Sequence, residues 1–126
     1  MKRVTAEWAE RGEGDFTVAQ REMRTDDPLY NVVCFLCQQC AEKYLKAFLE
    51  EHDTPFENTH DLVMLLDLGA GKVPELESRK HELAYLSPFA IASRYPGIQT
   101  DRRTAEKAYE IAQQVRSIVR VKLRLP

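Results

Sequence analysis

Three cysteines, Cys34, Cys37 and Cys40, lie in the short segment CFLCQQC, and a cluster of thiols can hold a metal. Structural zinc sites and iron–sulfur clusters use four ligands, but the chain has no fourth cysteine, and His52 is the nearest histidine along the sequence. On a helix, Cys37 and Cys40 share the apolar face and Cys34 lies to its side. We therefore expect no metal or cofactor, and interpret Cys37 and Cys40 as small buried residues.

Asp15 is a candidate for a second kind of chemistry, the recognition of a phosphate. It follows Trp8 by two turns on the apolar stripe of a predicted helix, where a carboxylate needs a countercharge. Lys43, or Arg94 in the segment ASRYPG, could supply it. The result would be either a structural salt bridge that fixes the packing of two helices or part of a nucleotide-phosphate site.

His60 and Asp61 lie in the first turn of a short predicted helix. The N-terminus of a helix attracts anions, so this pair could help to bind one. Asp61 is also the ordinary complement of the helix dipole, which is the structural interpretation. Both interpretations stay open from the sequence.

Two apolar residues of the cysteine-containing helix, Phe35 and Leu49, are expected on its back, opposite the core face and beside Glu42 and Lys46. Isolated exposed apolar residues are common, but a large aromatic residue in this position favours a partner surface. Glu42 and Lys46 are four residues apart in the favourable order, which predicts an ion pair on the solvent side.

The last predicted helix carries a basic row, Arg116, Arg120 and Arg124, at intervals of four residues. Such a row could contact RNA phosphates or an acidic protein surface. The alternative is an ordinary solvated helix face, because Glu106 and Glu110 interrupt the row in the earlier half of the helix.

Five predicted helices position these residues, at 5–23, 29–52, 60–68, 74–86 and 103–123. Thr5, Thr59, and either Thr100 or Asp101 are the candidate N-caps. Four of the helices are long and their connections are short, which favours an antiparallel bundle. No segment shows a convincing strand pattern. We predict an all-α, up-and-down four-helix bundle with a short additional helix at 60–68.

Length and composition point to one domain over residues 1–126. The formal charge of −2 and the 30% of charged residues are typical of a globular protein, and they indicate no class of partner. The first residues contain no apolar signal region, and nowhere do enough apolar residues run together to span a bilayer. We therefore expect a cytoplasmic protein without a membrane segment.

The segment FLCQQCAEKYLKAFL, at residues 35–49, resembles the signature helix of HEPN domains. In that family the pattern is similar to aromatic-x-small-Gln-Gln-small-small-Glu-Lys-x-Leu-Lys-Ala, so Cys37 and Cys40 stand where small residues are usual. Shorter matches in the same order, EW followed by DF, then THDL and ASRYP, extend the resemblance over nearly the whole chain. The resemblance implies a small prokaryotic HEPN protein of the type that is paired with a minimal nucleotidyltransferase.

Many HEPN proteins are metal-independent ribonucleases that carry an arginine and, about four to six residues later, a histidine. This chain departs from that pattern, because the sequence YPGIQTDRRT after Arg94 contains no histidine. Without an imidazole the proton transfer of an RNA cleavage lacks its usual base. We therefore assign no catalytic residue.

The resemblance implies a non-catalytic, nucleotide- or substrate-binding subunit in a two-component, toxin–antitoxin-like system. The tentative nucleotide-binding residues are Asp15, Lys43, His60, Arg94 and Tyr95, and the tentative dimer or partner surface comprises Phe35, Leu49, Arg116 and Arg120. The implied partners are a second copy of the chain, the nucleotidyltransferase, and a nucleotide or RNA. The alternatives are an RNA-cleaving toxin and a structural dimerisation module.

Overall fold

Seven helical segments make up the regular structure of the computed structural model, which describes residues 1–126. They are α1 (Arg3–Met23), α2 (Tyr30–Glu51), α3 (Leu62–Leu68), α4 (Pro74–Glu77), α5 (Lys80–Leu86), α6 (Phe89–Ala92) and α7 (Arg102–Lys122). The absence of strands confirms the predicted all-α class. No helix combines the length and the hydropathy that crossing a membrane requires.

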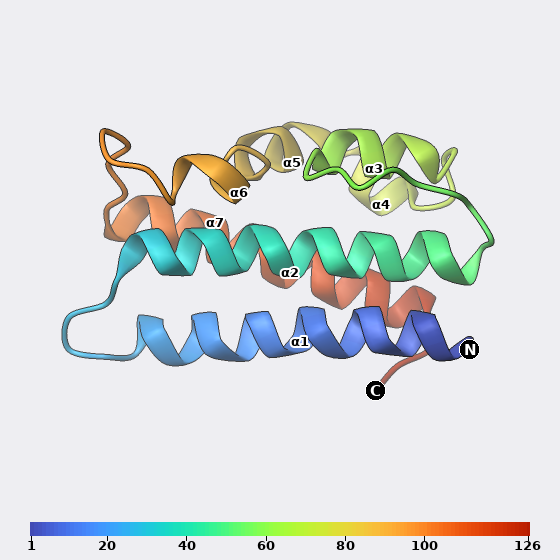
Figure 1. Ribbon diagram of the computed structural model, residues 1–126. Coiled ribbons are helices and arrows are strands. Elements are labelled where there is room, and N and C mark those ends of the chain that lie inside the picture. Colours follow the sequence, from blue (N-terminus) through green and yellow to red (C-terminus); the bar gives the residue numbers. More distant parts are fainter.

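The helices follow an up-and-down order in which the third arm is divided into short pieces (Figure 1). α1 and α2 run antiparallel, the chain returns through α3–α6, and α7 runs back across the bundle. The predicted continuous helix over 74–86 is wrong, because α4 ends at Glu77, where Ser78 Oγ donates to the Glu75 carbonyl at 3.0 Å. Pro88 lacks an N–H and separates α5 from α6.

α2 is the central helix, covered by α1, by α7 and by the short helices of the third arm (Figure 1). One cluster of 28 buried apolar residues surrounds it. Cys34 is fully buried together with Cys37 and Cys40, although we expected it beside the core face. Leu49, predicted on an exposed back, is only 1% exposed. Both expectations were wrong because a helix that is packed on several sides buries residues around most of its circumference.

The close packing of α1 against α2 depends on Gly12. A Cβ atom at this position would meet Tyr44 Cδ2 at 3.1 Å and the Cys40 carbonyl oxygen at 3.3 Å. Gly14, on the same helix, has open space at the equivalent point. Gly12 therefore allows the backbones of the two helices to approach each other.

The observed N-caps agree only in part with those predicted from the sequence. Asp101 caps α7 by accepting from the Thr104 N–H at 2.8 Å, as one of the two predicted alternatives required. α3 is capped by Asp61, which accepts from the N–H groups of its second and third residues, rather than by Thr59. Thr5 is not a cap either, because α1 begins before it and buries it.

Candidate functional site

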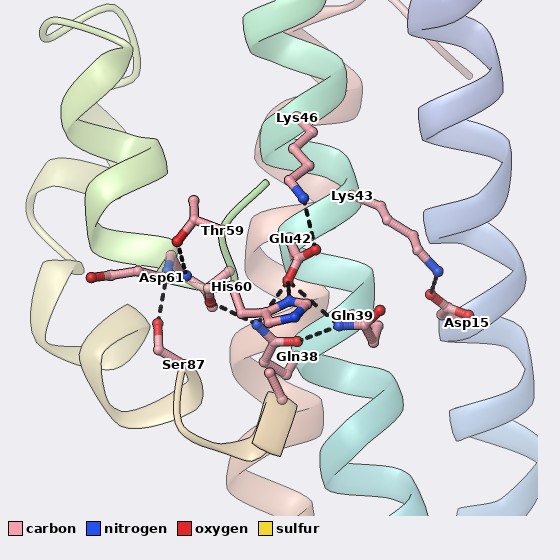
Figure 2. Close-up of polar contacts among 12 residues, drawn as sticks. Asp15, Gln38, Gln39, Glu42, Lys43, Lys46, Thr59, His60, Asp61 and Ser87 are labelled. Carbon is pink, nitrogen blue, oxygen red and sulfur yellow. Dashed lines mark hydrogen bonds and ion pairs between the residues drawn. The ribbon is translucent and has the colours of Figure 1, made fainter. Parts of the chain in front are cut away.

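The five tentative nucleotide-binding residues lie in three separate places. Asp15 and Lys43 meet between α1 and α2, whereas His60 lies in the connection between α2 and α3 (Figure 2). Arg94 and Tyr95 lie after α6, where they line a hollow that includes none of the other three. The structure therefore does not bring the predicted set together in one pocket.

Asp15 finds its countercharge in Lys43, one of the two predicted candidates. Lys43 Nζ lies 2.6 Å from Asp15 Oδ2, and the two side chains are 22% and 19% exposed. The pair links α1 to α2 directly (Figure 2). This geometry fits the structural interpretation of Asp15.

The first two arginines of the basic row, Arg116 and Arg120, bind to other helices of the bundle. Arg116 donates to both carboxylate oxygens of Glu13, each at 2.6 Å. Tyr44 donates to Glu13 at 2.7 Å and accepts from Arg120 Nη1 at 2.9 Å. Bidentate pairing of this kind orients both partners. Arg116 and Arg120 therefore serve as links between helices, which corrects their assignment to a partner surface.

Glu13 was not singled out from the sequence, although it lies at the centre of this network. The hydrogen bond from Arg116 lowers the pKa of Glu13, and that from Tyr44 adds to the effect, against the opposing influence of burial. Burial and the neighbouring Glu13 carboxylate raise the pKa of Tyr44. The network therefore holds a carboxylate, a neutral phenol and two guanidinium groups in a fixed arrangement.

A second polar network surrounds Glu42 (Figure 2). Glu42 Oε2 lies 2.9 Å from Lys46 Nζ, and Glu42 Oε1 lies 2.7 Å from His60 Nδ1. Gln38 Nε2 donates to Glu42 at 3.3 Å and to the His60 carbonyl at 3.0 Å, and Gln39 donates to Gln38 at 2.8 Å. The side chains of Glu42 and Lys46 are 5% and 3% exposed. Their predicted place on the solvent side was therefore wrong.

Burial by itself would raise the pKa of Glu42. Hydrogen bonds from His60, Lys46 and Gln38 outweigh burial, so the pKa lies below its ordinary value and Glu42 is a carboxylate. Lys46 is in turn enclosed by aromatic rings, with Nζ 5.4 Å from the centroid of Trp8 and 5.8 Å from that of Phe56. The buried charges of the network are thus all paired.

The one signal in the sequence for this network was the Gln-Gln and Glu-Lys pairs of the segment at residues 35–49. The helical-wheel argument placed Gln38, Glu42 and Lys46 on the back of the helix, and it was right about the face. A helical wheel of α2 cannot show that the α2–α3 connection and the third arm cover that face. The connection also brings His60 to Glu42.

Arg94 and Tyr95 line a hollow of about 510 Å³ between the segment after α6 and the start of α7. The guanidinium carbon of Arg94 lies 4.8 Å from the centroid of Phe35, so Phe35 is half-buried under a cation. Arg94 Nε donates to the Ala90 carbonyl at 2.9 Å, and no carboxylate pairs with this guanidinium. The terminal nitrogens of Arg94 are therefore available to an anion.

No histidine lines the Arg94 hollow. His60 lies at a different depression, the His52 ring is tilted against that of Phe48 with centroids 4.3 Å apart, and His81 is exposed on α5. The three-dimensional arrangement thus brings none of the three histidines to Arg94.

The HEPN domain model matches residues 5–122, which is nearly the whole chain. The chain belongs to the HEPN domain family. A crystal structure of an archaeal HEPN homologue, ST0689, is similar over 97% of this chain and 98% of that one, with a TM-score of 0.76 and 25% sequence identity. No curated protein matches this HEPN chain.

The three cysteines of this HEPN protein lie in apolar surroundings, and no three side chains of the metal-binding types gather anywhere in the chain. Burial raises the pKa of Cys34 to about 12 and raises that of Cys37 further above the ordinary value. The thiols are therefore held in the neutral form, which is a poor metal ligand.

Proposed function

We propose that this HEPN protein is the nucleotide- or substrate-binding subunit of a two-component system whose partner is a minimal nucleotidyltransferase. The partner would carry out the transfer chemistry. One observation supports the binding role most strongly: Arg94 lies in an open polar hollow, has no acidic partner and has no histidine beside it.

The side chains of this hollow suit a single nucleotide. Arg94 offers a planar guanidinium to a phosphate, and Tyr95, whose side chain is largely exposed, offers a ring for stacking against a base. Asn31 and Gln99 add amides that can hydrogen-bond to base edges. Since the hollow is lined by one guanidinium, Arg94, and one carboxylate, Asp101, the charge balance favours a nucleotide with few phosphates.

Asp15, Lys43 and His60 are not part of this proposed site. Asp15 and Lys43 neutralise each other, and His60 is bonded to Glu42. The proposal therefore reduces the tentative nucleotide-binding set to Arg94 and Tyr95 and adds Asn31 and Gln99.

Cleavage of RNA is the alternative function, and the free guanidinium of Arg94 is the observation that favours it. An arginine can stabilise the charge on a phosphate, but a cleaving enzyme also needs a group that accepts a proton from the 2′-hydroxyl. Incubation of the pure protein with labelled RNA separates the two functions. Intact RNA agrees with the proposal, and cleavage that disappears in Arg94→Ala would establish the ribonuclease.

The two-component arrangement is tested by co-expression with the protein encoded beside this chain. The proposal expects a short protein with the Gly-Ser and paired-Asp motif of nucleotidyltransferases, and a stable complex of the two on gel filtration. If the adjacent protein lacks this motif, or if the two proteins elute separately, the two-component arrangement is contradicted. Nucleotide binding at Arg94 is a separate claim and is tested by its own titration.

A homodimer remains part of the proposal, and of its two expected surfaces, the back of α2 and the flank of α7, we keep the second. Leu49 is buried, Phe35 is covered by Arg94, and α3–α6 occupy the back of α2. The flank of α7 is still available, since Val121 is 75% exposed. We propose that this flank contributes to the dimer, and light scattering of Val121→Glu beside the unchanged protein tests it: an unaltered dimer mass would exclude this flank.

A further inference from the structure

The imidazole of His60 is fixed at one nitrogen and free at the other. Nδ1 is bonded to Glu42 at 2.7 Å, and the His60 backbone carbonyl is held by Gln38 at 3.0 Å (Figure 2). Nε2 makes no hydrogen bond within the chain, and 43% of the side chain is exposed. The ring is thus oriented by a buried carboxylate while one nitrogen stays accessible.

The partner of Nδ1 decides what Nε2 can do. Glu42 is an ionised acceptor, so Nδ1 carries the hydrogen of the neutral ring. The lone pair of the neutral imidazole is then on Nε2. The same pairing of a carboxylate with one nitrogen fixes the tautomer of histidines in many binding and catalytic sites. In the neutral form of the ring, Nε2 of His60 is therefore a preset hydrogen-bond acceptor.

His60 lines a groove of about 700 Å³ between the α2–α3 connection and the helices α5 and α6. One wall is polar and contains Asn58, Thr59 and His60. The part of the lining that comes from α5, α6 and the link between them is mostly apolar and includes Pro88 and Ile91, and Ile91 is 57% exposed. The groove thus combines an acceptor with an apolar surface.

The charges around the groove limit the ligand. No lysine or arginine lines it, and its one charged side chain is Asp61, which is occupied in capping α3. A phosphate or a nucleotide would meet a carboxylate and no cation. The lining is therefore unsuited to an anion and suited to a neutral group that is mostly apolar and ends in a hydrogen-bond donor.

We propose that this groove binds a tyrosine side chain of a partner protein, with the phenol hydroxyl donating to His60 Nε2 and the ring lying against Pro88 and Ile91. A phenol combines a large apolar face with one donor, which is the combination that the two walls require. Serine and threonine lack the apolar face. This site is distinct from the Arg94 hollow and does not depend on nucleotide binding there.

Two ligands that differ by one hydroxyl test the proposal. N-acetyl-tyrosinamide and N-acetyl-phenylalaninamide are titrated separately while the ring signals of His60 are followed by NMR. A site built to bond a hydroxyl discriminates against the analogue that lacks it. We expect the tyrosine amide to bind about tenfold more tightly, the factor that corresponds to one net hydrogen bond. Equal affinities, or no change in the His60 signals with either amide, would overturn the proposal.

Three variants complete the test. His60→Gln is expected to remove the preference for the hydroxyl, and His81→Gln, on exposed α5, is expected to retain it. His60→Gln also removes the contact with Glu42, so a second variant is made at an exposed residue. Ile91→Asp is expected to weaken the binding of both amides. An unchanged preference in His60→Gln, unchanged affinities in Ile91→Asp, or tighter binding of N-acetyl-lysinamide than of the tyrosine amide would each contradict the proposed ligand.

Discussion

Glu42, on α2, and His60, 18 positions later, lie 2.7 Å apart between Oε1 and Nδ1. This bond connects the central helix to the segment that leads into α3. The other carboxylate oxygen of Glu42 bonds to Lys46, so one buried carboxylate holds both a cation of its own helix and the third arm of the bundle.

Replacing Glu42 by glutamine tests this relationship. Removal of the carboxylate leaves the ammonium group of Lys46 buried without its countercharge, and we expect the free energy of unfolding to fall by about 3 kcal/mol. Glu77→Gln is the matched control, because its pair with Lys80 is partly exposed to solvent and is expected to contribute much less to stability. Urea denaturation measures both variants. Equal losses of unfolding free energy in the two variants would show that the buried network stabilises the protein no more than a surface ion pair.

Stability should also depend on pH through Glu13 and Glu42. The pKa of each in the folded protein lies below the ordinary value of 4.5, so each contributes stability that is fully present above that value. The contribution is lost as the pH falls through the folded pKa values. We expect the free energy of unfolding to decline below about pH 4.5, and to decline less steeply in Glu42→Gln. A profile that is identical in the variant would contradict the role of Glu42.

Two glycines of α1 provide a matched pair of substitutions. At Gly12 an added methyl group meets the buried ring of Tyr44 and a backbone carbonyl, and we expect Gly12→Ala to destabilise the protein by about 1–2 kcal/mol. At Gly14 there is space, so alanine should stabilise the helix by about 0.5–1 kcal/mol. Thermal unfolding gives the sign of each change. A stabilising Gly12→Ala would show that α1 and α2 do not require this close approach.

The cysteines are expected to behave as buried apolar residues. Cys37→Ala should cost about 1 kcal/mol through a small cavity, and the purified protein should contain no stoichiometric zinc or iron. Since burial raises the pKa of Cys34 and Cys37, alkylation by iodoacetamide should be slow until the protein is unfolded. Rapid native alkylation, or metal that is lost in Cys37→Ala, would refute this interpretation.

The long helices were predictable because each has a clear period and a clear end. α1, α2 and α7 begin and end within two residues of the predicted positions. The third arm was not predictable in the same way. The pattern from Pro74 to Leu86 is compatible with one helix, and the break after Glu77 depends on local bonding of Ser78 that helical periodicity does not register.

The polar contacts were predictable only where one carboxylate clearly required a cation. Asp15 and Lys43 satisfy that condition, and they pair. The environment of Glu42 depends on the path of the connection from α2 to α3, which no spacing within α2 indicates. The same limit applies to Arg116, because its partner Glu13 is far away in the sequence and was not on the expected core stripe.

A titration with nucleotides tests the proposed binding role most directly. Each of the four ribonucleoside monophosphates is titrated into the protein and into two variants, Arg94→Ala and Arg11→Ala, the second of which removes an exposed arginine of α1. We predict saturable binding of at least one nucleotide, weakened about tenfold or more in Arg94→Ala, the effect of one lost charge-assisted hydrogen bond, and unchanged in Arg11→Ala. Absence of saturable binding to the unchanged protein, or equal weakening in both variants, would contradict a nucleotide site at Arg94.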